Sequence, residues 1–131
     1  MIGLDTNVLV RYIMQDEAKQ AAKATKLIEG LTEPAPGFIT LVSVVELVWV
    51  LSSSFELDRG QIAQALDVIL RSKQLVVDQA EQVARALRAY KAGNADFADC
   101  LIERTAVAAG CVKTMTFDVA AAKTAGMTLI Q

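Results

Sequence analysis

The 131-residue chain contains no histidine, and this absence excludes several kinds of active site. Ser-His-Asp and Cys-His catalysis both need an imidazole as general base, and histidine-ligated zinc needs one as a ligand. If the protein is an enzyme, its chemistry must depend on carboxylates, hydroxyl groups, lysine or a metal ion.

Cysteines, aromatic residues and long apolar runs are also scarce. Cys100 and Cys111 fit neither a CxxC nor a zinc pattern, and we expect both to be small core residues in a reducing cytosol. No apolar run approaches the roughly 20 residues of a membrane span, and the first five residues lack the basic region of a signal peptide. We therefore expect a cytoplasmic protein with no membrane partner.

What the chain does contain is enough apolar material for a core. It is 53% hydrophobic, which argues against disorder, and its length suits one domain over residues 1–131. The net charge of −2 does not exclude a nucleic-acid partner, because a local basic rim can coexist with an acidic site.

Short apolar runs alternate with longer helical patterns along the chain. The runs predict strands at residues 2–5, 38–40, 75–77, 112–116 and 127–130. Helices are predicted at 6–14, at 16–31, from a Ser43 cap to about 53, from an Asp58 cap to about 72, at 79–92 after an Asp78 cap, from about 95 to 109, and after Asp118. This alternation predicts a three-layer α/β/α fold with a central parallel sheet.

Four acidic residues interrupt or end apolar segments, and these are Asp5, Glu46, Asp99 and Asp118. Acidic side chains are rarely buried unless they are paired or bound to a cation. Neither Glu46 nor Asp118 has a basic neighbour in the sequence. We expect the four carboxylates to converge on a divalent cation, and hard oxygen ligands of this kind suit Mg²⁺ or Mn²⁺.

The predicted elements place these acids at one edge of the sheet. Asp5 and Asp118 each follow a predicted strand, and Glu46 and Asp99 lie early on helices that start at the same edge. Asp96 and Asp99 are three residues apart, on one face of their helix.

Each acid also has an ordinary structural interpretation. Asp5 and Asp118 could be helix N-caps, and Asp96 could complement a helix dipole. Glu46 could complete a capping box with Ser43, whereas Asp99 has no evident capping role. The metal interpretation accounts for all of these positions at once.

Four short motifs, taken in order, resemble the motifs of the PIN domain. They are Leu4-Asp5-Thr6-Asn7, Ser43-Val44-Val45-Glu46, Asp96-Phe97-Ala98-Asp99 and Thr116-Phe117-Asp118. Each motif alone is weak, but their order, spacing and the overall length agree, so the resemblance covers the whole chain. The size and the Asp-Phe-Ala-Asp form are most similar to the VapC-like toxin ribonucleases of bacterial toxin–antitoxin pairs.

The resemblance implies a Mg²⁺- or Mn²⁺-dependent endoribonuclease that cuts an RNA such as tRNA or rRNA. It also implies a homodimer neutralised by a VapB-like antitoxin. Carried over by position, it assigns catalysis and metal binding to Asp5, Glu46, Asp99 and Asp118, with Asp96 as a further metal ligand at the edge. It assigns the orientation of these carboxylates to Thr6, Asn7, Ser43 and Thr116.

A negative pocket that accepts RNA needs basic residues near it. Arg11, one helix past Asp5, and Arg104, on the Asp99 helix, are the candidates for binding the RNA backbone. Lys19, Lys23 and Lys26 are better explained as an ordinary solvated face. With one Trp and two Tyr, base stacking cannot be extensive, so recognition by shape and backbone is expected.

Two other functions remain open. A haloacid-dehalogenase-like phosphatase also begins with a strand followed by Asp, but it needs a second Asp where Asn7 stands. A non-catalytic RNA- or protein-binding PIN domain would usually have lost an acid, and every acid is present here. The apolar helices at 44–51 and 62–70 add the expectation of a homodimer.

Overall fold

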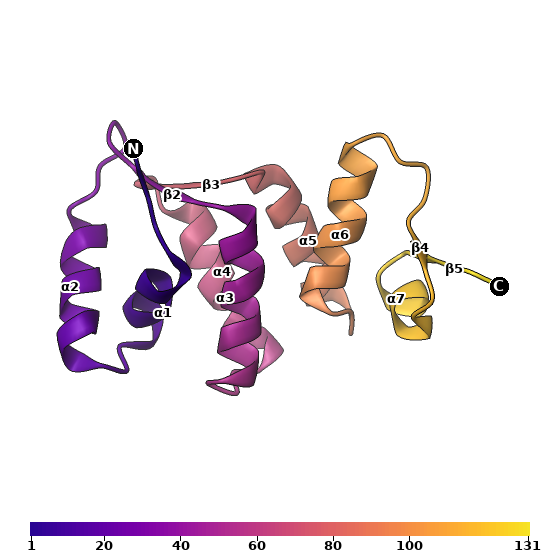
Figure 1. Cartoon of the computed structure of the whole chain (residues 1–131), viewed down its shortest axis with the longest axis horizontal. Helices are drawn as coiled ribbons and strands as arrows, with labels where there is room; N and C mark the ends of the chain where they lie inside the picture. Colours follow the sequence, from indigo (N-terminus) through magenta and orange to yellow (C-terminus); the bar gives the residue numbers. More distant parts are fainter. The chain divides into compact units, whose positions relative to one another are not determined.

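The computed structural model describes residues 1–131, which form two compact units (Figure 1). The first unit is Met1–Asp78 and the second is Gln79–Gln131. Each unit contains parallel strands joined by helices, and each is described in turn.

The first unit is built on a three-stranded parallel sheet in the order β1-β2-β3. The strands are β1 (Ile2–Gly3), β2 (Gly37–Ile39) and β3 (Leu75–Val77). Parallel neighbours need crossover connections, and two helices supply each of them here. A Cβ at Gly37 would lie 2.8 Å from side-chain atoms of Leu4 and Leu31, so a larger residue there would have to displace these two side chains.

Four helices pack in succession beside this sheet. They are α1 (Thr6–Met14), α2 (Ala18–Glu29), α3 (Leu41–Ser53) and α4 (Arg59–Arg71). Helix α1 contacts both α2 and α3, α3 contacts α4, and α4 contacts β3 (Figure 1). Their apolar faces bury Leu9, Ile28, Leu47, Leu51 and Leu66 almost completely, and these side chains form the core.

The second unit contains a helix pair and a small parallel sheet. Helices α5 (Ala80–Ala92) and α6 (Phe97–Ala108) lie side by side (Figure 1). Tyr90 and Phe97 make an edge-to-face contact with their ring centroids 5.7 Å apart. Strands β4 (Met115–Thr116) and β5 (Thr128–Leu129) pair in parallel. Helix α7 (Val119–Thr124) connects them and packs against both.

The predicted α/β class, with parallel strands alternating with helices, is confirmed. Several helix starts differ from the prediction. Helix α2 begins at Ala18 after a Glu17 N-cap rather than at residue 16, and α6 begins at Phe97 rather than at about residue 95. Two N-caps were also predicted wrongly. Thr40, not Ser43, is the N-cap of α3: its Oγ1 accepts the Ser43 backbone N–H at 3.1 Å. Glu46 therefore lies in the second turn of α3 and takes no part in a capping box.

Asp78 was the second wrong cap. Helix α5 starts from Gln79, which adopts a left-handed backbone (φ 51°) and makes no side-chain capping hydrogen bond. Asp58 does cap α4 as predicted. It completes a capping box, in which Asp58 Oδ1 accepts the Gln61 N–H at 2.8 Å and Gln61 Oε1 accepts the Asp58 N–H at 3.0 Å.

Two further expectations concern the fourth strand and the cysteines. Pairing begins later than predicted, since Val112 is 96% exposed and β4 covers only Met115–Thr116. Cys100 is buried, but Cys111 is exposed and is not the core residue that we expected.

None of the helices has both the length and the apolar character needed to cross a lipid bilayer.

Candidate active site

Asp5 lies where the chain leaves β1 and enters α1. Its backbone is extended, and its Oδ1 accepts the Thr6 N–H at 2.7 Å, so it is the N-cap of α1. The capping interpretation of Asp5 is therefore correct. It does not exclude the metal interpretation, because the cap uses one carboxylate oxygen and the exposed side chain keeps a second.

Asp5 and Glu46 line the same pocket of the first unit. This open cavity of about 570 Å³ is lined by Asp5, Thr6, Asn7, Val10, Arg11, Asp16, Glu46, Val50, Ser54 and Phe55. Asp5, Asn7 and Glu46 are exposed, whereas Thr6 is buried beneath them. Members of the first two motifs thus share one cavity, and Thr6 supports it from below.

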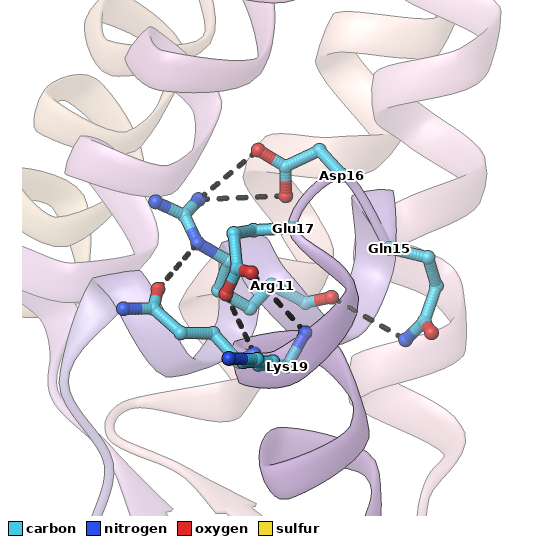
Figure 2. A network of polar contacts seen from close by, with 6 residues as sticks. Arg11, Gln15, Asp16, Glu17 and Lys19 are labelled. Carbon is cyan, nitrogen blue, oxygen red and sulfur yellow. Dashed lines mark hydrogen bonds and ion pairs between the residues drawn. The ribbon is translucent and has the colours of Figure 1, made fainter.

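Arg11 lines this pocket and is held there by Asp16, in the turn between α1 and α2, and by Gln20 of α2. Arg11 donates from Nε to Gln20 Oε1 at 2.8 Å and from Nη1 to Asp16 Oδ2 at 3.3 Å. Figure 2 shows the guanidinium of Arg11 facing the carboxylate of Asp16. Gln15 closes the turn with a left-handed backbone (φ 52°) and donates from Nε2 to the Tyr12 carbonyl at 2.8 Å. The predicted RNA contact therefore already has two protein partners.

Asp16 is a pocket residue that the sequence reasoning missed. It brings a third carboxylate to the lining, where its ion pair with Arg11 offsets its charge. The signal for this contact in the sequence was the short separation between Arg11 and Asp16. A basic residue near the end of one helix and an acidic residue just beyond it can meet across a tight turn. Since both side chains are about one-third exposed, this pair contributes little to stability.

Ser43 was predicted to orient Glu46. The structure buries Ser43 and gives it Thr40 as its partner: the Thr40 hydroxyl donates to Ser43 Oγ at 3.2 Å. This contact fixes the first turn of α3 and so the position of the turn that carries Glu46. Ser43 therefore helps to position Glu46 by fixing the start of α3, and not by a direct hydrogen bond to it.

The remaining predicted acids belong to the second unit. Asp99 lies in the first turn of α6 and is half-buried, while Asp96 occupies the N-cap position without a capping hydrogen bond. Burial raises the pKa of Asp99, and the nearby carboxylates of Asp96 and Asp118 raise this pKa further. Asp96 and Asp118 are therefore each close enough for their charges to act on Asp99.

Asp118 is the N-cap of α7. Its Oδ1 accepts the N–H groups of Ala120 at 2.8 Å and Ala121 at 3.3 Å. The Thr116 hydroxyl in turn accepts the Asp118 backbone N–H at 3.0 Å. Thr116 thus fixes the backbone of Asp118, and the second carboxylate oxygen of Asp118 stays available.

The donor set fits a hard divalent cation. All predicted ligands are carboxylates, and a bound cation would relieve the unfavourable effect of Asp96 and Asp118 on the charge of Asp99. Within either unit, however, no group of three Asp, Glu or Cys side chains is close enough together to hold one ion. The convergence of all four acids stays a prediction.

Arg104 makes its main contact with a residue that was not predicted. Its Nε and Nη2 contact the carboxylate of Glu103, the one acidic side chain that the structure buries. This hydrogen bond raises the pKa of Arg104. Glu103 lies four residues after Asp99 on α6. Its place as a charged residue on the packed face of that helix was the signal in the sequence that could have identified it.

Comparison with known proteins bears on the whole chain. The family model described as PIN domain matches residues 2–127, a range that covers most of both units and includes every predicted acid. No curated protein matches the chain.

Proposed function

This chain belongs to the PIN domain family, and on that premise we propose that it is a Mg²⁺- or Mn²⁺-dependent endoribonuclease. PIN domains are typically metal-dependent nucleases, which is the chemistry that a carboxylate site without histidine can perform. We propose further that the protein is the toxin of a VapC-like toxin–antitoxin pair and that its substrate is a structured RNA such as tRNA or rRNA.

The observation that carries the proposal is the pocket shared by Asp5, Asn7 and Glu46. These residues come from two sequence motifs on different elements, and a packing role does not explain why three exposed polar side chains share one cavity. Together with Asp96, Asp99 and Asp118, Asp5 and Glu46 would hold the metal. When bound, a divalent cation supplies activation of water and neutralisation of charge on the phosphate oxygens.

The other residues of the pocket have roles that follow from their contacts. Arg11 uses Nε and Nη1 for Gln20 and Asp16, which leaves Nη2 to bind a phosphate oxygen of the RNA. The fixed guanidinium would orient the phosphodiester next to Asp5 and Glu46. The Thr6 N–H holds the Asp5 carboxylate and the Thr116 hydroxyl holds the backbone of Asp118, so these carboxylates need little reorganisation on binding a cation.

A protein partner is proposed at the outer face of α3. Leu41, Val42, Val45, Glu46 and Trp49 line a mainly apolar pocket of about 550 Å³, and Val42 and Trp49 are 77% and 66% exposed. Exposed apolar surface of this kind supports association with another chain. We propose that it contributes to a homodimer and that a VapB-like antitoxin neutralises the assembled toxin.

The experiment is RNA cleavage by the purified protein with Mg²⁺, with Mn²⁺ and with EDTA. Cleavage should require the cation, and Asp5→Asn should abolish it while Glu33→Gln, at an exposed turn outside the pocket, should not. Cleavage that survives EDTA would argue against a metal-dependent nuclease. Hydrolysis of small phosphate esters without RNA cleavage would favour a phosphatase.

A further inference from the structure

A second pocket lies entirely within the second unit and has a different chemistry. It has a volume of about 510 Å³ and is lined by Arg85, Arg88, Ala89, Cys100, Glu103, Arg104, Thr124, Ala125 and Gly126. Three guanidinium groups therefore face one cavity that contains a single carboxylate. None of the four sequence motifs accounts for this cluster.

We propose that this pocket binds a backbone phosphate of the RNA substrate. The proposal rests on the proposed function, since it assigns the pocket to the same RNA that the acids would cleave. Guanidinium groups bind phosphate through parallel hydrogen bonds, and clusters of arginine are suited to this ligand. The volume lies in the range of about 300–1,000 Å³ that is usual for ligand pockets.

Two of the arginines are held in place by carboxylates and still have donors to spare. Arg104 directs Nε and Nη2 at Glu103, which leaves Nη1 for a ligand. Arg85 donates from Nη2 to Glu81 Oε1 at 2.8 Å, one turn earlier on α5. Arg104, which makes two contacts with a buried carboxylate, loses little conformational entropy when it binds an anion.

Arg88 differs from its neighbours, because the structure gives it no ion pair and no side-chain hydrogen bond. It is exposed, lies less than one turn after Arg85 on α5, and lines the pocket with it. Its charge is therefore not compensated locally. Glu81 and Glu103 offset the charges of Arg85 and Arg104, so Arg88 leaves the pocket with a net positive charge that an anion would balance.

Glu103 positions Arg104 at the pocket and is not itself a group that would bind the ligand. It is only 9% exposed and lies against the turn at Gly126, where a Cβ would lie 3.8 Å from its carboxyl carbon. A buried carboxylate is stable only when it is paired, which explains the contact with Arg104. The negative charge of Glu103 is thus largely neutralised by its ion pair within the protein, whereas the guanidinium of Arg104 borders the cavity.

The position of the pocket relative to Asp99 fits a bound strand. Both Asp99 and Arg104 are on α6, and five residues of helix rise about 7.5 Å. The two residues are therefore within two turns of one helix, a short distance for one RNA strand to span. The pocket would hold a phosphate near the one that is cleaved, and so fix the register of the RNA.

The test is RNA binding by the full chain in EDTA, measured by fluorescence anisotropy at several salt concentrations. We expect Arg88→Gln and Arg85→Gln each to weaken binding about 5- to 10-fold and to lower the salt slope by about one. Arg71→Gln, an exposed arginine at the end of α4, removes the same charge outside the pocket and should change affinity less than twofold. Circular dichroism would establish that each variant is folded.

Separate outcomes decide the two proposals. RNA cleavage by the wild type with Mn²⁺, combined with equal RNA binding by Arg88→Gln and Arg71→Gln, would overturn the phosphate pocket alone. Absence of cleavage by the wild type would overturn the proposed function. If polyglutamate bound the wild type and not Arg88→Gln, while RNA bound both equally, the pocket would be a site for acidic peptides and the phosphate proposal would be wrong.

Discussion

The side chains of Asp5 and Glu46 line one pocket, although Asp5 caps α1 directly after the first strand and Glu46 lies in the second turn of α3. The parallel pairing of β1 with β2 explains this, because the helices that follow the two strands start at the same edge of the sheet. The topology thus brings together residues that are distant in sequence.

Removal of a carboxylate from this pocket should weaken metal binding. We expect Asp5→Asn to lower the affinity for Mn²⁺ by at least about tenfold, because Asn keeps the N-cap hydrogen bond to Thr6 but loses the charge. Isothermal titration calorimetry would measure this, with Glu33→Gln as the control. Equal affinities in the wild type and Asp5→Asn would exclude Asp5 as a ligand.

The stability of the metal-free protein should depend on the charge of Asp99. Burial, Asp96 and Asp118 together raise the pKa of Asp99, so the folded chain binds this proton more tightly than the unfolded chain does. The stabilisation is present at low pH and is lost as the pH rises through the folded pKa. In EDTA, Asp99→Asn should therefore be more stable than the wild type at neutral pH.

Urea unfolding at a series of pH values would check this prediction. The advantage of Asp99→Asn should shrink towards acidic pH, where Asp99 of the wild type is protonated. An advantage that stayed constant with pH would show that the carboxylate charge is not its cause.

The ion pair between Arg11 and Asp16 should matter more for RNA than for folding. Asp16→Asn should change the free energy of unfolding by less than about 1 kcal/mol, because the pair is solvent-exposed. It should tighten RNA binding, since it removes a negative charge from the pocket lining and releases Nη1 of Arg11. Anisotropy titrations of Asp16→Asn and Arg11→Gln should show shifts of opposite sign.

The apolar face of α3 predicts an effect on assembly. If Val42 and Trp49 contact a second copy, Trp49→Glu should shift the protein from dimer to monomer. Light scattering at micromolar concentration would measure this, and Gln64→Glu, on an exposed position of α4, is the control for added charge. A wild type that is monomeric under these conditions would contradict the dimer proposal.

Much of the fold could be predicted where local signals were strong. Helix α1 has the predicted bounds because Asp5 caps an amphipathic segment, and β3 matches because its apolar run is bounded by polar residues. The start of α3 was missed because Thr40 and Ser43 are both good caps, and only the structure shows that Thr40 takes the Ser43 N–H.

The site was less predictable from the sequence. The motif acids could be found because each stands at the end of a strand or early in a helix, which is a local property. The burial of Glu103 and the cavity beside Arg104 depend on the packing of α5, α6 and the turn at Gly126. No local pattern encodes such packing, so the arginine pocket became visible only in the folded chain.

The central claim is that carboxylates of the four motifs hold the metal that RNA cleavage requires. The most direct test is RNA cleavage by the wild type and Asp99→Asn side by side in Mn²⁺, with melting curves for both. The account predicts cleavage by the wild type, a loss of at least about 100-fold in Asp99→Asn, and an intact fold with a smaller gain in stability from Mn²⁺. Equal cleavage by the two proteins would remove Asp99 from the site and contradict the claim.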